Sequence, residues 1–391
     1  MSAERELFKT TKLLMVFSGL WRLELSNSRR FVRSAYKIYS LSLQVFFNSV
    51  IISFVLEFCR LVSNDINTAI KILSRLIYVA LLTMKLTLCQ SKSMRKLLSI
   101  ALQDESDIYR QHDSEIRRIY TKHVKYCNKI TTAITICSFV LDIYLTEIGI
   151  EKSYKFSHNT ANSSLERPLP SPLWYPFDRN KFHVCALTYQ IIETFLTAIY
   201  SGSVQGVSNT VTIFFRAQLQ ILQHQLRHFD RFEFAQSDGE IGNHLRILVQ
   251  KHQDLIKWFD QLNQLFKKIL LLEYSVSSML MAAVLIQIFQ GEDVMFNGIY
   301  FCFIFGQLTI LSWNANEIKI QSSELSQSLY ESRWFECRQA EKMVIRIMMM
   351  RCQKPLTLTI GSFGAMTADV ALSRIKLAYS YVSLVSGGSG V

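Results

Sequence analysis

Long apolar stretches alternate with charged segments along this chain of 391 residues. A helix that crosses a membrane needs about 20 mostly apolar residues. We see no alternation of period two and few turn dipeptides, so the pattern predicts a mostly helical protein. It favours an all-α membrane protein with seven transmembrane helices, and the seven predicted spans are 36–58, 69–88, 130–150, 184–215, 269–289, 294–312 and 356–385.

Two of these spans are interrupted by charges. The second span contains Lys71, Arg75 and Lys85, and the last contains Asp369, Arg374 and Lys376. The alternative is that such segments are core helices of a soluble protein. Other spans argue against it, since the stretch 270–289 holds a single acid and no base. The composition is 49% hydrophobic and 19% charged, with a mean hydropathy of +0.16. Apolar and charged residues are therefore segregated, as membrane spans and loops require.

The basic residues indicate how the chain is oriented. They gather before the first span, between the second and third spans, and between the fourth and fifth spans. Cytosolic loops carry an excess of Lys and Arg, and a cytosolic N-terminus places all three basic segments inside the cell. The net charge of +12 then reflects membrane topology, and we expect no nucleic-acid partner. The 152–182 loop falls outside and contains a glycosylation sequon at Asn162.

Motifs for catalysis or metal binding are absent from the sequence. The 8 cysteines are scattered, and no histidine stands at metal spacing beside them. There is no Gly-rich phosphate loop, GxSxG or HExxH sequence. We therefore expect no enzyme activity, no cofactor and no metal site.

The segments on the predicted cytosolic side are also patterned as helices. Leu255, Phe259, Leu262 and Phe266 recur at helical spacing. Spans four and five are therefore expected to continue into the cytosol as long amphipathic helices, and the region 318–350 is similar. Such apolar faces need a protein partner, and we predict that they form an anchor region.

The N-terminal segment 1–35 is predicted to be cytosolic and amphipathic. Its apolar run, 13–20, is short for a signal peptide. We expect a helix that lies at the membrane interface, with Phe8, Lys12 and Trp21 near the lipid headgroups.

Short patterns at the two ends of the chain resemble those of insect odorant receptors. Gly19-Leu20-Trp21 precedes the first span, and the other matching residues surround the last span. These are Ser323-Glu324-Leu325, Tyr330, Trp334, Gln353, Pro355, Leu356, Gly361, Asp369 and Tyr379-Ser380-Tyr381. The resemblance is specific in residues only toward the C-terminus, and elsewhere it is one of topology. Arg374 departs from it, since the family usually has an aliphatic residue there, and 386–391 resembles an artificial linker.

The resemblance implies a subunit of a tetrameric channel in the plasma membrane of a sensory neuron dendrite. Residues 36–315 would form spans one to six with cytosolic extensions, 316–354 the cytosolic anchor part of span seven, and 355–385 its pore-lining part. The loop between spans four and five is shorter than in the Orco-type co-receptor. This favours an odorant-tuning subunit that assembles with that co-receptor. The anchor residues would be Ser323, Glu324, Tyr330, Trp334 and Pro355.

Five residues of the last span recur at steps of four, with one step of three. They are Asp369, Ser373, Leu377, Ser380 and Leu384, which share one helix face. Packing on a neighbouring span is the alternative, but mixed Asp, Ser and Leu suit a water-filled path for cations with an apolar constriction. The resemblance implies that Leu384 is the gate.

The resemblance also implies a ligand pocket in the outer half of the membrane, among spans two, three, four and six. Large apolar and aromatic side chains there suit a volatile ligand held by buried area and dispersion. Packing within the bundle, or a place in the aromatic belt at the membrane interface, is the alternative role of such residues. The candidates are Ile77, Tyr78, Phe139, Ile143, Tyr144, Ile192, Phe195, Ile199, Phe296 and Tyr300.

Acids within or near the spans are functional candidates because charges inside a membrane are costly. They are Glu57, Asp142, Glu147, Glu193 and Glu273, and Asp142 is the most central. The sequence favours an odorant-gated, nonselective cation channel subunit. A gustatory-type receptor of the same superfamily is the first alternative. A secondary transporter is the second, although we find none of the internal repeats that it would have.

Overall fold

The protein is almost entirely helical in the part of the chain that the structure, a computed structural model, describes. That part comprises residues 6–21, 30–63, 66–110, 113–159, 169–229, 238–289, 291 and 293–370, together with 372, 373, 376 and 380. Its only β-type contact is an isolated bridge between Thr359 and Ala365. The helices are α1 (Lys9–Phe17), α2 (Arg30–Leu61), α3 (Ile66–Cys89), α4 (Lys92–Arg110), α5 (Ser114–Asn159), α6 (His183–Arg227), α7 (Asp238–Phe289), α8 (Val294–Tyr330), the 3₁₀ helix η2 (Trp334–Glu336) and α9 (Gln339–Cys352).

The predicted all-α membrane fold is confirmed. Among the described residues, five helices are long and apolar enough to cross a membrane, namely α2, α5, α6, α7 and α8. Helix α3, the predicted second span, is not one of these five, and most of the last predicted span lies outside the described residues. The predicted extensions of spans four and five are present, since α6 has 45 residues and α7 has 52.

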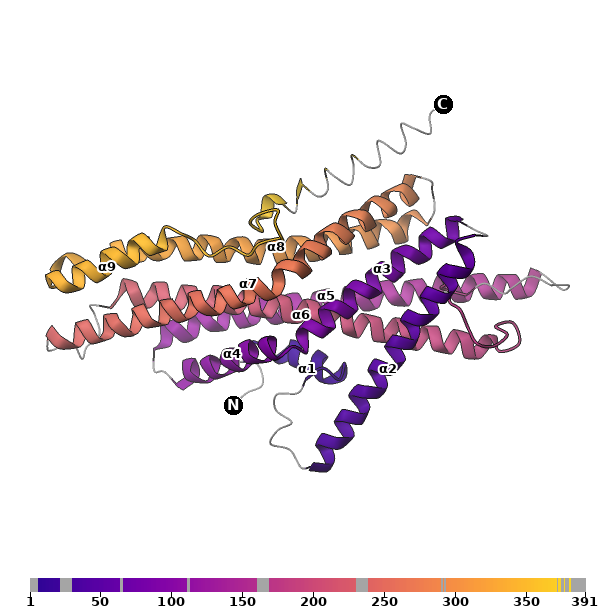
Figure 1. The fold of residues 1–391 in the computed structure, drawn as a ribbon, viewed down its shortest axis with the longest axis horizontal. Helices are drawn as coiled ribbons and strands as arrows, with labels where there is room; N and C mark the ends of the chain where they lie inside the picture. The colour runs from indigo at the N-terminus through magenta and orange to yellow at the C-terminus, as the bar shows by residue number, and fades with distance from the viewer. Residues whose placement is uncertain are drawn as a thin grey trace.

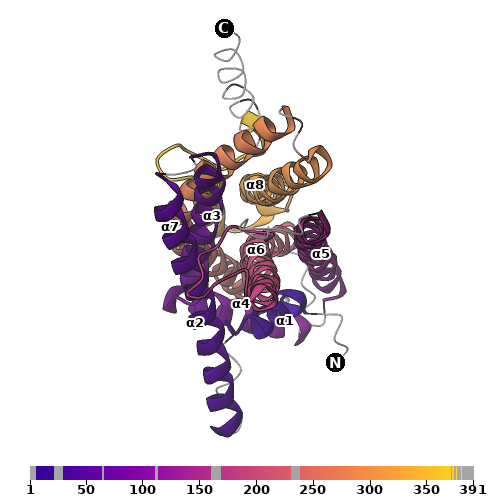
Figure 2. The same ribbon diagram turned by 90° about the vertical axis from the view of Figure 1, so that its right-hand side faces the viewer.

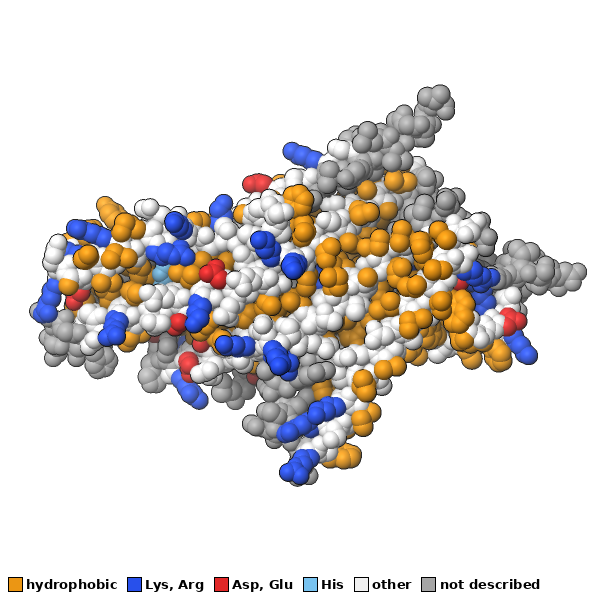
Figure 3. Space-filling model, in the orientation of Figure 1, with side chains coloured by type: hydrophobic (Ala, Val, Ile, Leu, Met, Phe, Trp, Pro, Cys, Tyr) orange, Lys and Arg blue, Asp and Glu red, His pale blue; other side chains and the backbone are white. Residues whose placement is uncertain are grey.

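The long helices α5, α6, α7 and α8 run side by side along the molecule (Figure 1). The molecule has a charged end and an apolar end (Figure 3). The charged end contains α4, α9, the last turns of α6 and the first half of α7. Figure 3 shows Lys and Arg side chains gathered there, whereas apolar side chains dominate the opposite half until charges reappear at its far edge. An apolar band between two charged zones is the surface that a lipid bilayer requires.

Helix α6 lies at the centre of the bundle, between α5 and α8 on one side and α3 and α7 on the other (Figure 2). Two glycines let α5 approach it. A Cβ at Gly202 would lie 3.0 Å from Thr135 Oγ1, and one at Gly206 would lie 3.1 Å from Thr131 Cγ2. Small residues spaced by four are a common means of close helix packing in membranes.

One face of the N-terminal helix is buried against the bundle, which the sequence did not predict. We expected Phe8 and Trp21 near lipid headgroups, but they are only 1% and 2% exposed, because α1 packs against α5 and α6. The backbone N–H of Leu7 donates to Glu105 Oε1 at 2.7 Å. Burial raises the pKa of the Glu105 carboxyl. This hydrogen bond and the buried face of α1 thus hold the segment against the bundle.

The predicted anchor region is divided differently from our expectation. We assigned 316–354 to the last span, but α8 continues without a break to Tyr330, so Ser323 and Glu324 extend span six. Helix α9 is a separate element that packs on α8. Periodicity alone does not reveal which span a cytosolic helix continues.

The predicted last span also starts later than expected. Residues 353–367 are not helical, and helical backbone resumes only at Ala368. The segment forms a tight turn in which Met366 N donates to Leu358 O at 2.7 Å, and Gly361 has a positive φ of 55°. Pro355 has no N–H to donate, and the left-handed backbone at Gly361 ends any helix.

Candidate functional site

A cavity of about 280 Å³ lies within the apolar half of the bundle, near the connection between α7 and α8. Residues of α3, α5, α6, α7 and α8 line it, together with Phe54 of α2. Its volume is at the lower end of the range for small-molecule sites. The other lining residues are Arg75, Tyr78, Val79, Ser138, Leu141, Asp142, Leu145, Glu193, Thr194, Thr197, Ala198, Ser201, Leu280, Ala283, Val284, Gln287, Phe296, Asn297, Tyr300 and Phe303.

Three of the ten candidate ligand residues line this cavity: Tyr78, Phe296 and Tyr300. The Tyr78 hydroxyl donates to Ser201 Oγ at 3.2 Å, across the α3–α6 contact. The rings of Phe296 and Tyr300 are stacked, with centroids 6.0 Å apart. These aromatic side chains form one wall of the cavity.

The other seven candidates are not among the lining residues. The α5 residues that do line the cavity, from Ser138 to Leu145, follow helical spacing and occupy one face. Phe139 and Ile143 belong to neighbouring faces, and Tyr144 lies behind the wall, stacked on Phe296 at 5.8 Å. Ile143, Ile192 and Phe195 are 53%, 49% and 45% exposed. The remaining three residues outside the lining are Ile77, Phe139 and Ile199.

The cavity contains polar and charged residues that our ligand set omitted. Arg75, Asp142 and Glu193 come from three different helices and line the same space. Asp142 and Glu193 stood out in the sequence as intramembrane acids, and Arg75 as a charge within the second span. What the sequence did not indicate is that the three groups face one cavity.

A second cavity of about 50 Å³ adjoins the first on the side of the charged end. The two share Tyr78, Ser201 and Tyr300 among their lining residues. Its polar centre is a buried ion pair between Lys85 of α3 and Glu273 of α7. Gln205 and Gln307 surround the pair; Gln205 Nε2 donates to Glu273 Oε1 at 3.0 Å and to Gln307 Oε1 at 3.2 Å. This network connects α3, α6, α7 and α8 on the side of the larger cavity that faces the charged end.

The candidate pore and anchor residues are only partly described. Asp369, Ser373 and Ser380 are exposed on this chain, whereas Leu377, Leu384 and the sequon residue Asn162 lie outside the described residues. In the anchor set, Ser323, Glu324 and Tyr330 are exposed, and Trp334 and Pro355 are half-buried.

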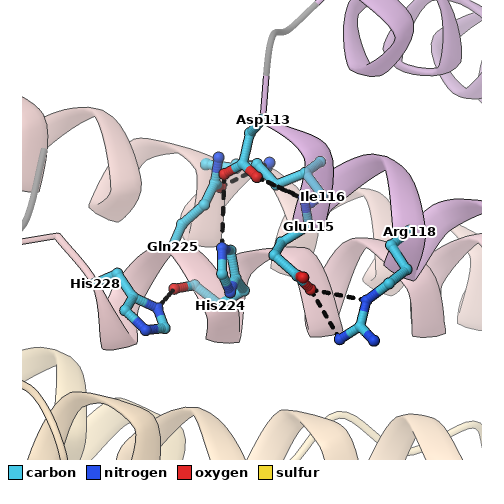
Figure 4. Close-up of polar contacts among 8 residues, drawn as sticks. Asp113, Glu115, Ile116, Arg118, His224, Gln225 and His228 are labelled. Atoms are coloured by element: carbon cyan, nitrogen blue, oxygen red, sulfur yellow. Dashed lines mark hydrogen bonds and ion pairs between the residues drawn. The ribbon is translucent and has the colours of Figure 1, made fainter.

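A polar cluster at the charged end joins the start of α5 to the end of α6 (Figure 4). Asp113 Oδ1 accepts from the backbone N–H of Glu115 at 2.8 Å, and Asp113 Oδ2 lies 3.6 Å from His224 Nε2. The ring of His228 stands 4.7 Å from that of His224. Within the described part of the chain, no three His, Cys, Asp or Glu side chains are arranged to hold a metal. The cluster is therefore a helix cap and an interhelical contact.

Comparison with known proteins identifies the family. A profile described as 7tm Odorant receptor matches residues 64–379. Odorant receptor 10 of Aedes albopictus is 27% identical over 187 residues, which cover 45% of this chain and 48% of that protein. Odorant receptor 59b of Drosophila melanogaster is 22% identical over 345 residues, which cover 86% of this chain and 81% of that protein. The chain thus spans about half the length of the first relative and most of the second.

The fold agrees with that of a solved receptor. The insect olfactory receptor OR5 from Machilis hrabei has a TM-score of 0.76 to this chain, covers 97% of both chains and is 14% identical. The structure of that receptor in complex with eugenol has the same TM-score, coverage and identity. Since the family profile covers most of the sequence, this chain belongs to the insect odorant receptor family.

Proposed function

We propose that this chain is the odorant-binding, tuning subunit of a ligand-gated, nonselective cation channel. It binds a small volatile molecule in the 280 Å³ cavity and opens a pore lined by its last span. It assembles with an Orco-type co-receptor as a heterotetramer in the plasma membrane of a sensory neuron dendrite, with its N-terminus in the cytosol. The cavity within the apolar half of the bundle is the observation that carries this proposal.

The lining of the cavity suits a volatile ligand. Leu141, Val79, Leu280 and Val284 offer apolar surface, and the stacked pair of Phe296 and Tyr300 offers a flat wall. Apolar contact contributes roughly 25 cal/mol per Å² of surface removed from water, so a small ligand gains most of its affinity by burial. The solved relative was studied in complex with eugenol, a small aromatic molecule.

Helix α7 provides a route from the cavity to the start of the pore segment. It contributes Leu280, Ala283, Val284 and Gln287 to the lining. Nearer the N-terminus of the same helix, Asn263 Oδ1 accepts from the backbone N–H of Thr359 at 2.9 Å, and Lys267 O accepts from Gly361 N at 3.0 Å. A ligand opens the pore only if it binds the open arrangement more tightly than the closed one. We infer that a shift of α7 makes this difference.

The proposed pore and subunit contacts rest on residues that are exposed on this chain. Asp369, Ser373 and Ser380 are exposed polar residues of the last span, which supports a wet face there. Leu377 and Leu384 are proposed as its apolar constriction. The anchor has exposed apolar side chains that support contact with neighbouring subunits. They are Tyr330, Phe335, Met343, Ile347 and Met350.

The test is whole-cell current in cells that express the chain with and without an Orco-type co-receptor, during exposure to a panel of volatiles. We expect odorant-evoked cation current only with the co-receptor. Ala283→Phe places a ring in the cavity and should abolish the response while surface expression is kept. Met279→Phe is the matched control, because Met279 lies on the exposed face of the same helix. An unchanged response of the Ala283 variant would contradict binding in this cavity.

The match to the odorant receptor family supports this proposal over a gustatory-type receptor. A response to polar tastants and to no volatile would favour that alternative.

A further inference from the structure

The larger cavity carries an unbalanced set of charges, and this inference about them rests on the ligand-binding part of the proposed function. Asp142 and Glu193 bring two carboxylates to the lining, and Arg75 brings one guanidinium. Lys85, in the adjoining cavity, is already engaged by Glu273. When all of these groups are ionised, the larger cavity has one more negative charge than positive.

The two carboxylates share one nearby cation, Arg75. Glu193 is 7% exposed, and its oxygens accept only from the neighbouring hydroxyls of Thr197 at 3.3 Å and Thr194 at 3.4 Å. No ion pair within 4.0 Å among the described side chains involves Asp142 or Glu193. A buried acid that shares a single cation with a second acid is costly in a membrane protein. A site that binds a cation offers a reason for retaining such an acid.

Aromatic rings on the lining point to the same ligand chemistry. Phe54, Tyr78, Phe296, Tyr300 and Phe303 all line the cavity. The face of an aromatic ring carries partial negative charge and attracts ammonium groups within about 6 Å. Two carboxylates among five rings therefore form an environment that favours cations. A carboxylic acid ligand would find one Arg75 but two competing carboxylates.

We infer that the preferred ligand class of this cavity is a small volatile amine, bound in its ammonium form. Its nitrogen donates to the carboxylates of Asp142 and Glu193, and its apolar body lies against the aromatic wall. Arg75 offsets one of the two carboxylates and leaves the other for the ligand. The volume of about 280 Å³ limits the ligand to a single ring or a short chain.

The experiment measures ligand binding directly, so that it does not depend on pore opening. The purified protein is titrated with 2-phenylethylamine, 2-phenylethanol and phenylacetate, which share one carbon skeleton, and its thermal stabilisation gives apparent affinities. We expect the amine to bind roughly 10-fold or more tightly than the other two, since hydrogen bonds to charged groups are strong. Equal affinities, or tighter binding of the alcohol or the acid, would overturn the inference.

Variants test whether the named groups are responsible. Asp142→Asn and Glu193→Gln keep the shape of each side chain, and each should weaken amine binding roughly 10-fold while that of the alcohol is kept. Arg75→Gln should have the opposite effect and favour the amine further. Glu147→Gln is the control, because Glu147 is an exposed acid of the same helix outside the cavity. Amine binding that survives both acid substitutions would refute the assignment.

The inference and the proposed function fail in different ways. Current evoked by neutral volatiles together with amine binding no tighter than that of the alcohol would keep the channel proposal and overturn this inference. Selective amine binding without any evoked current, despite surface expression with the co-receptor, would support the inference and contradict the channel proposal.

Discussion

The ion pair between Lys85 and Glu273 offers the sharpest test of what holds the bundle together. The two side chains are only 9% and 7% exposed, and they join α3 to α7. We consider Lys85→Met, which keeps the length of the side chain and removes its charge. The carboxylate of Glu273 then retains only its hydrogen bond from Gln205 Nε2 at 3.0 Å.

The expected cost follows from this burial. Removing one partner of a buried pair costs about 3–5 kcal/mol, because it leaves a charge without compensation. Replacing both partners in Lys85→Met/Glu273→Leu removes that charge. The double variant then loses mainly one acceptor of Gln205, at about 1–2 kcal/mol, since Gln205 also bonds to Gln307 at 3.2 Å. The double variant should therefore be more stable than Lys85→Met alone.

The assay is thermal unfolding of the purified protein in detergent. At roughly 2 °C per kcal/mol, the value for large domains, Lys85→Met should lower the melting temperature by about 6–10 °C. Arg118→Gln is the control, because it breaks an exposed ion pair. Arg118 Nη2 lies 2.8 Å from Glu115 Oε2 (Figure 4), and an exposed pair of this kind is worth less than about 1 kcal/mol. A melting temperature within about 2 °C of the unsubstituted protein would refute the reasoning. So would a double variant less stable than Lys85→Met.

Three further predictions concern stability in the same assay. Gly361→Ala should cost about 1–3 kcal/mol, because the backbone is left-handed there and a Cβ would lie 2.8 Å from a side chain of α7. Gly298→Ala, in the second turn of α8 where the added Cβ meets open space, should be neutral or stabilising. Asn263→Ala should cost about 1–3 kcal/mol, because it leaves the N–H and hydroxyl of Thr359, now 2.9 and 3.0 Å from the amide oxygen, without their acceptor; an unchanged melting temperature would contradict this. Burial raises the pKa of the Asp104 carboxyl from 3.8 to about 6, so the folded protein binds a proton there more tightly than the unfolded chain does. The stability that this proton contributes is lost as pH rises from about 4 to about 6. Asp104→Asn should flatten the dependence of the melting temperature on pH between about 4 and about 6. The same dependence in both proteins would show that this carboxyl does not titrate as stated.

The sequence by itself determined the architecture and the family. Apolar stretches long enough to span a bilayer and the distribution of Lys and Arg are properties of the chain in one dimension, so they can be read without a fold. The helical spacing from Leu255 to Phe266 likewise predicted the extension of α7, which the structure confirms. The motifs around Trp334 and Pro355 led to the odorant receptor family, which the match over 64–379 shows.

The tertiary structure decided which face of each span surrounds the cavity. A span that is apolar all around carries no mark of its inward face, and its rotation is set by its neighbours. Tyr78 therefore lines the cavity while the adjacent Ile77 does not, and Asp142 does while Ile143 is exposed. The turn over 353–367 depends on hydrogen bonds to α7 and was equally hidden from a hydropathy pattern.

The meeting of Arg75, Asp142 and Glu193 shows the same division most clearly. The sequence marked each as a charge within a span, because a charge in lipid is costly wherever it stands. It contained no sign that they belong together, because they are far apart in the chain and come from three helices. Their proximity results from the packing of α3, α5 and α6 around one space, and only contacts between distant segments determine that packing.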